Sequence, residues 1–425
     1  MGVRNDTGPA LRARLPVNTM GQNPKRIVII GGSFGGLNAA YALRRALGEQ
    51  AQITVISRDK EFVFMPSLPW VIMGWREPGQ LQVALENVLP RRGIRFVHAE
   101  VRELDALGCE VATENERFQY DILIVASGAE LDYAAVPGLG PDGGHTHSTF
   151  TVDEATRARD ALARVLAAQH GRIVIGAAPG ASCIGPAYEI AMMIDTVLRR
   201  ARKRHGFDIK FVTPEPFLGH FGVGGIGAFP RLMADEFAER DIQPVTNAKL
   251  TEARADRLVL ADGSEHAFDF ALVIPAFLGA AFVRGVEGLA NPKGFVLVKP
   301  ELASVKFDNI YAVGVAVAIP PVGATRVPVA VPKTGHWAEL MAQAAAHNIV
   351  VEFKGGAKRD GLTAPVTCIA DAGDTGFYLS ADPYLPPRNK VVHKQGKWAR
   401  YLKVAFEKYY LARVRHDWPS LHFGW

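Results

Sequence analysis

The sequence predicts an α/β protein built from two Rossmann-like dinucleotide-binding domains, one inserted in the other, with a small C-terminal region after them. An apolar strand followed by a turn and a helix occurs twice, at 26–46 and again at 172–204. The 425 residues are too many for one typical core, and 48% of them are apolar with 21% charged, which is the balance of a globular protein.

The first strand–turn–helix unit opens a doubly wound sheet. Its strand is Arg26–Ile30, its turn Gly31–Gly36 and its helix Leu37–Ala46, and the next strand is Ile53–Ile56. The turn follows the G-x-G-x-x-G pattern that lets a backbone approach a pyrophosphate, with Ser33 in the middle position.

Two later segments strengthen the prediction of a nucleotide site. After the second strand, Ser57 or the nearby Asp59 takes the place of the usual ribose-binding acid. Residues 121–128 and 309–314 resemble the second and third fingerprints of flavin domains, although Val315 stands where an aspartate is usual. Three fingerprints in the right order predict that the chain binds FAD.

The second strand–turn–helix unit differs at its turn. Strand 172–176, helix 186–204 and strand 208–213 give the βαβ order, but Ala177, Ala178 and Pro179 occupy the turn. A backbone that carries those side chains cannot easily approach a pyrophosphate. Cys183 stands at the start of the helix, where the helix dipole favours a thiolate. The unit therefore looks converted from nucleotide binding to sulfur chemistry.

Composition and segment boundaries narrow the function classes. We expect a leader at 1–24, flavin-domain parts at 25–150 and 296–360, the inserted domain at 151–295 and a C-terminal region at 361–425. The leader has no apolar core and does not read as a signal peptide, and no run of eighteen apolar residues predicts a transmembrane helix. Three cysteines without a Cys-x-x-Cys pair exclude a disulfide framework and a zinc ribbon, and we expect no metal. The net charge of +5 is too diffuse to indicate nucleic acid.

Several segments resemble the sulfide:quinone oxidoreductase family of two-dinucleotide-domain flavoproteins. The resemblance covers residues 25 to about 423 and is carried most specifically by Gly180–Glu189 with Cys183 and by Pro332–Gly335. It is also carried by Phe64–Val71, Glu215–His220, Ile274–Phe277, Ala318–Val322, Cys368–Asp371 and Lys403–Tyr409. One departure is that Phe150 precedes Thr151-Val-Asp153, where the family commonly has a third redox cysteine.

The resemblance implies a mechanism and its residues. A disulfide of Cys183 and Cys368 would accept hydrosulfide and pass two electrons to FAD and then to a membrane quinone. His220 and Glu189 are candidates for proton transfer, whereas Cys109 reads as a packing thiol in a hairpin. Because no thiol stands at position 150, FAD is expected to be non-covalent.

The residues expected to contact the cofactor come from the three fingerprints and from the family segments. They are Gly31, Gly32, Ser33, Phe34, Gly35, Gly36, Ser57, Arg58, Ser67, Val101, Ser127, Gly128, Gly314, Val315, Lys333 and Gly335. Lys333 would place a positive charge beside the flavin ring. The quinone is expected to contact Ile369, Lys403, Phe406 and Phe423.

The C-terminal helix suggests a membrane surface. Trp398, Leu402, Ala405, Tyr409 and Ala412 recur at spacings of four and three, the stripe of an amphipathic helix. The residues around the stripe are mostly basic: Lys397, Arg400, Lys403, Lys408, Arg413 and Arg415. We therefore expect a peripheral protein of the inner (cytoplasmic) membrane, attached through this helix, with a homo-oligomer as a further expectation. The alternative that stays open is that the helix simply covers the flavin domain.

Three alternatives stay open at this point. A flavocytochrome c-type sulfide dehydrogenase flavoprotein would use the same two cysteines but deliver electrons to a haem subunit. A type II NADH:quinone oxidoreductase shares the fold but needs an open second turn and an acid after the following strand, where this chain has Thr213-Pro214. The third alternative is a scaffold that has lost its activity.

Overall fold

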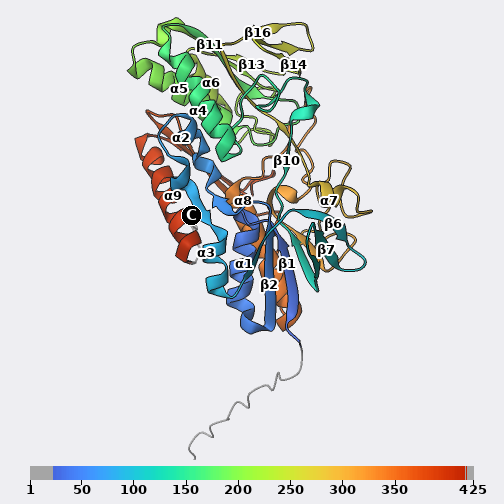
Figure 1. Cartoon of the computed structure of the whole chain (residues 1–425). Helices are drawn as coiled ribbons and strands as arrows, with labels where there is room; N and C mark the ends of the chain where they lie inside the picture. The colour runs from blue at the N-terminus through green and yellow to red at the C-terminus, as the bar shows by residue number, and fades with distance from the viewer. Residues whose placement is uncertain (1–22, 417, 419–425) are drawn as a thin grey trace, which may run out of the picture.

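The computed structural model describes residues 23–416 and 418. It has two lobes, one above the other in the view of Figure 1. The lower lobe in Figure 1 holds a five-stranded parallel sheet in the order β19-β9-β1-β2-β5. Its strands are β1 (Lys25–Ile30), β2 (Ala51–Ser57), β5 (Arg95–His98), β9 (Ile122–Val125) and β19 (Ile310–Ala312). This is the doubly wound sheet that the first fingerprint predicts.

The strands of the lower sheet are apolar on both faces. The strands β1 and β9 are almost continuous runs of buried Ile, Val and Leu, as expected for parallel strands that are covered on both sides. Helix α1 (Phe34–Leu47) follows β1 and packs along α8 (Gly335–Lys354), so elements from the two ends of the chain complete one domain.

The upper lobe repeats the same plan on a smaller scale. Its four-stranded parallel sheet has the order β13-β12-β11-β17, formed by β11 (Gly171–Ala177), β12 (Phe207–Val212), β13 (Ile242–Val245) and β17 (Phe270–Ile274). Helices α4 (Val152–Ala167), α5 (Gly185–Arg200) and α6 (Phe229–Glu239) pack around it (Figure 1). The helix predicted at 186–204 is thus shorter, because Arg202 adopts a left-handed backbone with φ 59°.

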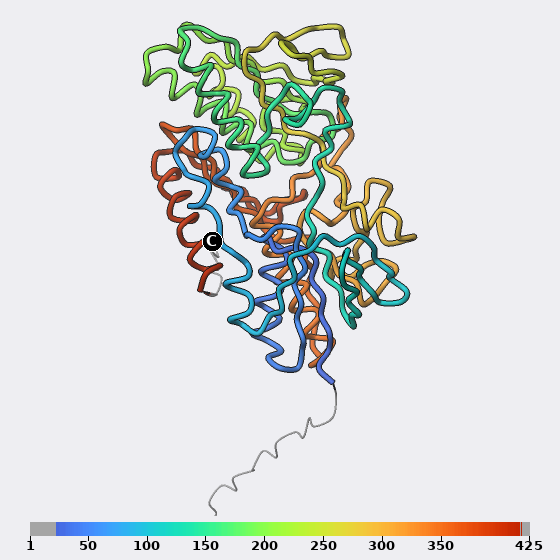
Figure 2. The backbone as a smooth tube through the Cα atoms, viewed as in Figure 1, coloured from blue at the N-terminus to red at the C-terminus, as the bar shows by residue number. Residues whose placement is uncertain are grey.

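The chain crosses between the lobes twice. It rises through β10 (Glu130–Asp132) and returns through β18 (Ala276–Leu278), and these two strands pair antiparallel (Figure 2). The predicted arrangement, one Rossmann-like domain inserted in another, is therefore confirmed, while its exact boundaries stay a prediction.

Short antiparallel sheets and short helices surround the two parallel sheets. They are β3 (Glu61–Val63) with β4 (Gln82–Ala84); β6 (Val101–Asp105), β7 (Glu110–Thr113) and β8 (Arg117–Gln119); β14 (Leu250–Arg254), β15 (Arg257–Leu260) and β16 (Glu265–Ala267); and the helices α2 (Leu68–Ile72), α3 (Leu85–Val88) and α7 (Ala281–Arg284).

The C-terminal region lies against both lobes. A three-stranded antiparallel sheet is formed by β20 (Val366–Asp371), β21 (Gly376–Asp382) and β22 (Lys390–Gln395). The last helix, α9 (Lys397–His416), runs down the side of the lower lobe away from β6 and β7 (Figure 1). Strand β20 also packs on α5, which brings Cys368 to the second strand–turn–helix unit.

Candidate functional site

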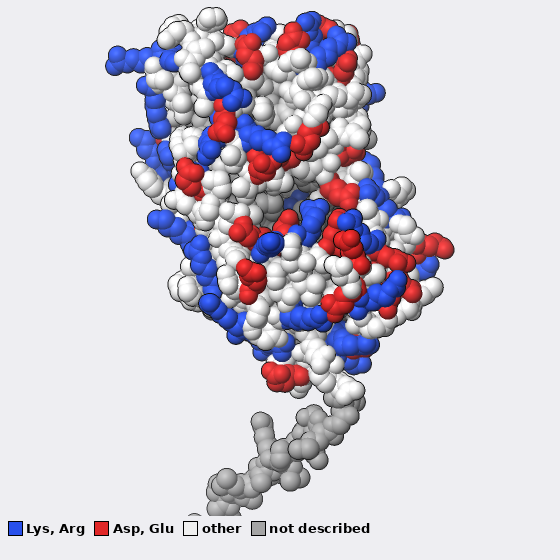
Figure 3. All heavy atoms as spheres, viewed as in Figure 1, with Lys and Arg blue, Asp and Glu red and all other residues white. Residues whose placement is uncertain are grey.

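A cavity of about 1520 Å³ lies between the lobes and is lined by residues of the three fingerprints, of the second strand–turn–helix unit and of the C-terminal region. The molecular surface is hollowed at this junction (Figure 3). The lining joins the Gly31–Gly35 turn, the start of α5 with Cys183, strand β20 with Cys368, and helix α9. One continuous space therefore connects the predicted flavin, sulfur and quinone sites.

The first glycine turn fits a dinucleotide. Gly31 has φ 111°, and a Cβ on it would lie 2.2 Å from the carbonyl oxygen of Ala126, so only glycine fits. Helix α1 begins at Phe34, and its N-cap residue Ser33 makes no side-chain capping hydrogen bond. The first N–H groups of α1 are thus left for a ligand, and a helix N-terminus favours an anion such as pyrophosphate.

The other two fingerprints open onto the same space. The buried Ser127 hydroxyl has no hydrogen-bond partner among the described residues, and a Cβ added to Gly128 (φ 74°) would have no atom within 4 Å. Orphaned donors and an open glycine fit a polar cofactor. Of the expected cofactor residues, the cavity lining contains all but Gly36 and Ser67. A Cβ on Gly36 would meet the Gly31 carbonyl oxygen at 1.9 Å, so this glycine shapes the turn from behind.

Lys333 enters the cavity as a buried cation. Its ammonium donates to the carbonyl oxygen of Val317 (3.0 Å) and lies 4.3 Å from the ring centre of Phe295. Burial lowers the pKa of Lys333 to about 8. No carboxylate of the described residues forms an ion pair with it, which suits a lysine that faces an electron-rich ligand.

Cys183, at the start of α5, and Cys368, in β20 of the C-terminal region, line the same cavity as free thiols. Burial raises the pKa of Cys183 to about 11, and the charge of Glu189 adds to the effect. Burial, together with the charges of Cys183 and Glu189, raises the pKa of Cys368 to about 12. The expectation that a helix dipole favours the Cys183 thiolate is wrong for this state, because desolvation outweighs the dipole.

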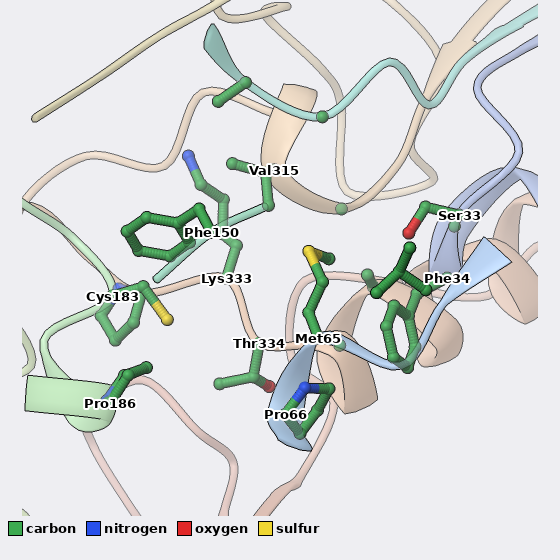
Figure 4. Close-up of a pocket in the computed structure, with 18 of the residues that line it drawn as sticks. Ser33, Phe34, Met65, Pro66, Phe150, Cys183, Pro186, Val315, Lys333 and Thr334 are labelled. Carbon is green, nitrogen blue, oxygen red and sulfur yellow. The ribbon is translucent and has the colours of Figure 1, made fainter. Parts of the chain in front are cut away.

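Phe150 lies beside Cys183 across the cavity from Ser33 and Phe34 (Figure 4). Its ring packs edge-on against Phe277 with centroids 5.1 Å apart. Cys109 lies elsewhere, in the turn between β6 and β7, where its sulfur accepts a hydrogen bond from the Asn309 amide (3.3 Å). Position 150 thus contributes an apolar wall, and the third thiol of the chain does not reach the cavity.

Glu189 and Lys403 form a buried ion pair in the cavity wall. The Lys403 ammonium donates to Oε1 of Glu189 (2.5 Å), and the backbone N–H of Asp371 donates to the same oxygen (2.6 Å). Burial raises the pKa of Glu189 despite this pairing. Lys403 also lies 5.0 Å from the ring centre of Trp70, whose indole N–H donates to Asp371 (2.8 Å).

Helix α9 therefore presents its charges differently from the prediction. Lys403 and Arg413, expected on an outer basic face, are buried, and Arg413 pairs with Glu339 (2.5 Å). The predicted apolar stripe borders the cavity and is partly exposed: Trp398 is 44% exposed, and Leu402, Ala405 and Tyr409 line the cavity. Charged residues of one helix can be buried only with such partners. Exposed Lys and Arg side chains remain along the edge of the molecule that carries α9 (Figure 3).

The expected quinone residues divide into three groups. Ile369 and Phe406 line the cavity, and Phe406 packs edge-on against Phe64. Lys403 lines it while paired with Glu189. Phe423 lies outside the described residues.

The turn of the second unit is closed by the chain itself. Residues 325–331, here called the crossing segment, run over it: Gly180 donates its N–H to the Pro328 carbonyl oxygen (2.6 Å), and Ala330 donates to Ala181 (3.1 Å). The segment buries Val327, Val329 and Val331. In a nucleotide-binding turn, the backbone N–H of Gly180 would be available to a phosphate.

An acid does follow the next strand, but it points inward. Glu215 is fully buried and accepts hydrogen bonds from the Tyr188 hydroxyl (2.7 Å), the Thr213 hydroxyl (2.8 Å) and the Phe221 N–H (2.7 Å). A ribose-binding acid must keep an oxygen for the 2′-hydroxyl at the crevice. Glu215 instead holds the loop after β12, which the sequence does not reveal.

Histidine placement also differs from expectation. His220 is not among the described residues that line the cavity; its Nδ1 accepts the Gly222 N–H (3.1 Å) and its ring packs on Phe217. His336, which the sequence analysis did not single out, does line the cavity. Its Nδ1 accepts a hydrogen bond from the N–H of Thr367 (3.1 Å), the residue before Cys368. Burial lowers the pKa of both histidines.

Two further kinds of feature bear on the expected function. Within 23–416 and at 418, no helix has the length and apolarity that crossing a bilayer requires. The same residues contain no group of three or more His, Cys, Asp or Glu that could hold a metal ion.

Comparisons with known proteins agree with the geometry. Residues 25–334 match the pyridine nucleotide-disulphide oxidoreductase family. The sulfide-quinone reductase of Aquifex aeolicus is 39% identical over 92% of this chain and 91% of its own. The crystal structure of the sulfide:quinone oxidoreductase from the same bacterium superposes with a TM-score of 0.87 at 38% identity, covering 92% of this chain and 91% of that one.

A more distant relative shows the fold alone. The structure of NDH2 from Plasmodium falciparum in complex with NADH has a TM-score of 0.69 at 13% identity, covering 90% of this chain and 94% of that one. The glycine turn, the cysteine placement and the near-complete match to the Aquifex protein lead to one assignment, which implies a flavin cofactor. This chain belongs to the sulfide:quinone oxidoreductase family of the pyridine nucleotide-disulphide oxidoreductases.

Proposed function

We propose that this protein oxidises hydrosulfide at Cys183 and Cys368 and passes the electrons through non-covalently bound FAD to a quinone. The observation that carries the proposal is that these two thiols, from segments far apart in the chain, line one cavity with the first glycine turn. A dithiol beside a flavin site can store and release two electrons. The family of the chain supports the same substrates.

The sulfur step begins from the oxidised pair. Hydrosulfide forms a bond to one cysteine sulfur, the disulfide bond breaks, and the electron pair remains on the other cysteine as a thiolate. The product is a persulfide beside a thiolate, both within the cavity. The buried surroundings of Cys183 and Cys368 exclude bulk water from this reactive sulfur.

The flavin would be held by the Gly31–Gly35 turn, Ser127–Gly128 and Gly314, and would accept two electrons and deliver them to the quinone. Lys333 would face it with a positive charge below pH about 8. Position 150 holds a phenylalanine, so the chain offers no thioether there, and the FAD should come free on denaturation.

Protons must move with the electrons. Oxidising hydrosulfide to zero-valent sulfur releases one proton and two electrons, whereas reducing a quinone to the quinol takes up two of each. Glu189 and Lys403 line the same cavity as the cysteines and the residues proposed for the quinone, Ile369 and Phe406. We assign them the transfer of protons within this cavity, because burial raises the pKa of the Glu189 carboxyl and so favours its holding a proton that it can pass on.

The partly exposed apolar stripe of α9 is the proposed contact with the membrane. Trp398 (44% exposed) and Tyr401 (70% exposed) lie at its start, next to the basic strand β22. Aromatic residues with nearby cations are typical of helices that lie in a lipid interface. A quinone could then reach the cavity directly from the bilayer through Leu402 and Tyr409. Attachment to the inner membrane from its cytoplasmic side, and a homo-oligomeric state, remain parts of this proposal.

The release of the sulfur chain should depend on a second small molecule. Phe150 replaces the thiol that the family commonly has there, so no protein sulfur at that position can take the chain over. A second hydrosulfide, or sulfite, must then attack the persulfide. Turnover should rise with added sulfite beyond the concentration that flavin reduction requires. Turnover that ignores sulfite, with fast flavin reduction, would contradict this route of release.

The test is quinone reduction by the purified, flavin-loaded protein. With hydrosulfide and a short-chain ubiquinone analogue under argon, we expect quinol formation at a rate that follows enzyme concentration. Copurifying haem, with no quinol formed, would instead favour the sulfide dehydrogenase flavoprotein. Colourless protein that binds no added FAD would favour an inactive scaffold.

A further inference from the structure

Tyr384 carries an unusual hydroxyl for a buried tyrosine. The side chain is only 3% exposed and lines the cavity, yet no described residue forms a hydrogen bond with its hydroxyl. Among other buried tyrosines, the hydroxyls of Tyr188, Tyr311 and Tyr410 have partners in Glu215, Glu352 and Asn38, whereas that of Tyr120, which is not in the described cavity lining, has none. An unpartnered hydroxyl on a residue that lines the cavity is available to a ligand there.

The surroundings of Tyr384 fix its position. Its ring packs edge-on against Trp337 with centroids 5.1 Å apart, and its backbone N–H donates to Ala364, just before β20. Its carbonyl oxygen accepts from the Arg388 guanidinium (2.9 Å), which also donates to the carbonyl oxygens of Gly225 and Val223 (2.8 Å each). The hydroxyl therefore stays at one point in the cavity wall while the sulfur chemistry proceeds.

Tyr384 lines the same cavity as both reactive sulfurs, and its backbone is tied to the chain just before the strand that carries Cys368. Burial, together with the charges of Cys368 and Cys183, keeps the pKa of its hydroxyl well above 10. It therefore remains protonated and can only donate to an anion at working pH. In the free-thiol state, however, no hydrogen bond joins the hydroxyl to either cysteine sulfur among the described contacts.

A persulfide on either cysteine extends farther into the cavity than the thiol does. The S–S bond is about 2.05 Å long, so the terminal sulfur of a persulfide extends that much farther into the cavity. It also carries the negative charge once it loses its proton. The lining that holds the cysteines includes the apolar side chains of Phe229, Met233, Phe377 and Leu379 and the polar groups of Glu189, His336 and Thr367.

We infer that the Tyr384 hydroxyl is the hydrogen-bond donor that holds the terminal sulfur of the cysteine-bound sulfur chain. This inference rests on the proposed sulfide chemistry and names the group that binds its intermediate. A donated hydrogen bond stabilises the persulfide anion over its protonated form. It also offsets negative charge on that sulfur, which hydrosulfide or sulfite attacks as the S–S bond breaks and the cysteine thiolate leaves.

The test uses Tyr384→Phe in a Cys109→Ala background, so that only the cavity cysteines remain. The reduced, flavin-loaded protein is treated with polysulfide: a cysteine thiolate bonds to a terminal sulfur and releases a chain one atom shorter. The persulfide is then trapped with iodoacetamide across a pH series and counted by mass spectrometry. We expect Tyr384→Phe to alkylate about tenfold more slowly at pH 7, with its profile moved up by about one pH unit.

A matched variant separates this role from packing. Tyr311→Phe removes an equally buried hydroxyl in β19, outside the described cavity lining, and should leave the alkylation profile unchanged. Identical profiles for wild type and Tyr384→Phe, both with full FAD content, would overturn the inference. Because the persulfide is made chemically, a wild type that hydrosulfide fails to reduce would refute the proposed function while leaving this test intact.

Discussion

The two strand–turn–helix units of this protein share one topology and differ at one turn. In the first, β1 leads through Gly31–Gly36 into α1, and the N–H groups at the start of the helix face the cavity. In the second, β11 leads through Ala178 and Gly180 into α5, and the crossing segment takes the Gly180 N–H.

The difference shows how a nucleotide site becomes a sulfur site. Closure of the second turn removes the donors that a nicotinamide dinucleotide needs, and Glu215 is turned into the protein by Tyr188 and Thr213. The start of α5 then becomes a wall of the same cavity that the first turn opens into, and Cys183 stands on that wall. The flavin site and the electron donor thus meet without a second nucleotide.

The largest effect should come from the cysteines. Cys183→Ala and Cys368→Ala should each lower the rate of sulfide-dependent flavin reduction by about 10⁴-fold or more. The two cysteines act as a unit, so the loss of either one removes the activity of both. Cys109→Ala, in the hairpin far from the cavity lining, should keep nearly the full rate. Stopped-flow absorbance measures all three. Fast flavin reduction in either cavity variant would show that the cysteine changed in that variant is not needed for sulfide oxidation.

The next effect concerns the first turn. Gly31→Ala forces φ 111° on a residue with a side chain and places its Cβ 2.2 Å from the Ala126 carbonyl oxygen. With strain of about 1–3 kcal/mol, FAD affinity should fall about ten- to a hundredfold. The matched change in the second turn, Ala178→Gly, should leave FAD content unaltered. Equal loss from both variants, measured as bound flavin per protein, would show that the two turns do not differ in this way.

The Cys183 thiol should react slowly at neutral pH in the folded protein. With the pKa of Cys183 at about 11 instead of 9.0, its thiolate fraction at pH 8 is about a hundredfold lower than in the unfolded chain. Iodoacetamide trapping of the reduced protein should therefore keep accelerating above pH 9 toward about 11. The reduced form should also lose stability over that same range, because the unfolded chain releases the thiol proton first. Trapping that levels off near pH 8 would contradict the desolvation argument.

The smallest effect should be at α9. Changing Trp398 and Tyr401 to Ala removes two exposed aromatic side chains and should weaken binding to anionic phospholipid vesicles about tenfold. Leu107→Ala changes an 86% exposed residue on the opposite side of the lower lobe and serves as the control in sedimentation. If both variants sediment like the wild type, α9 is not the membrane contact.

Sequence patterns predicted what local chemistry determines. The first domain was predicted from the glycines at 31 and 128 and from the apolar strands. The change of the second domain from nucleotide binding to sulfur chemistry was predicted from its Ala-Ala-Pro turn and Cys183. Strand periodicity and turn composition depend on neighbouring residues, so a single sequence carries them.

The remaining features arise from contacts between distant segments. Lys403 looked like a membrane-facing cation, but it meets Glu189, 214 residues earlier in the chain, inside the protein. The raised thiol pKa values, the closure by the crossing segment and the free hydroxyl of Tyr384 depend likewise on what packs nearby. The burial of a charged side chain by a distant segment leaves no pattern in the sequence around it. From the sequence alone, a charged residue on a helix is expected to face water, because most do.

The comparison of the two turns is tested most directly by offering both electron donors to one sample. Purified protein with its FAD is made anaerobic, and hydrosulfide or NADH is added to separate portions at micromolar concentration while the visible flavin absorbance is followed. The closed second turn predicts rapid bleaching by hydrosulfide and no useful rate with NADH. Rapid bleaching by NADH, with hydrosulfide inert, would contradict the account and assign the chain to dehydrogenase chemistry.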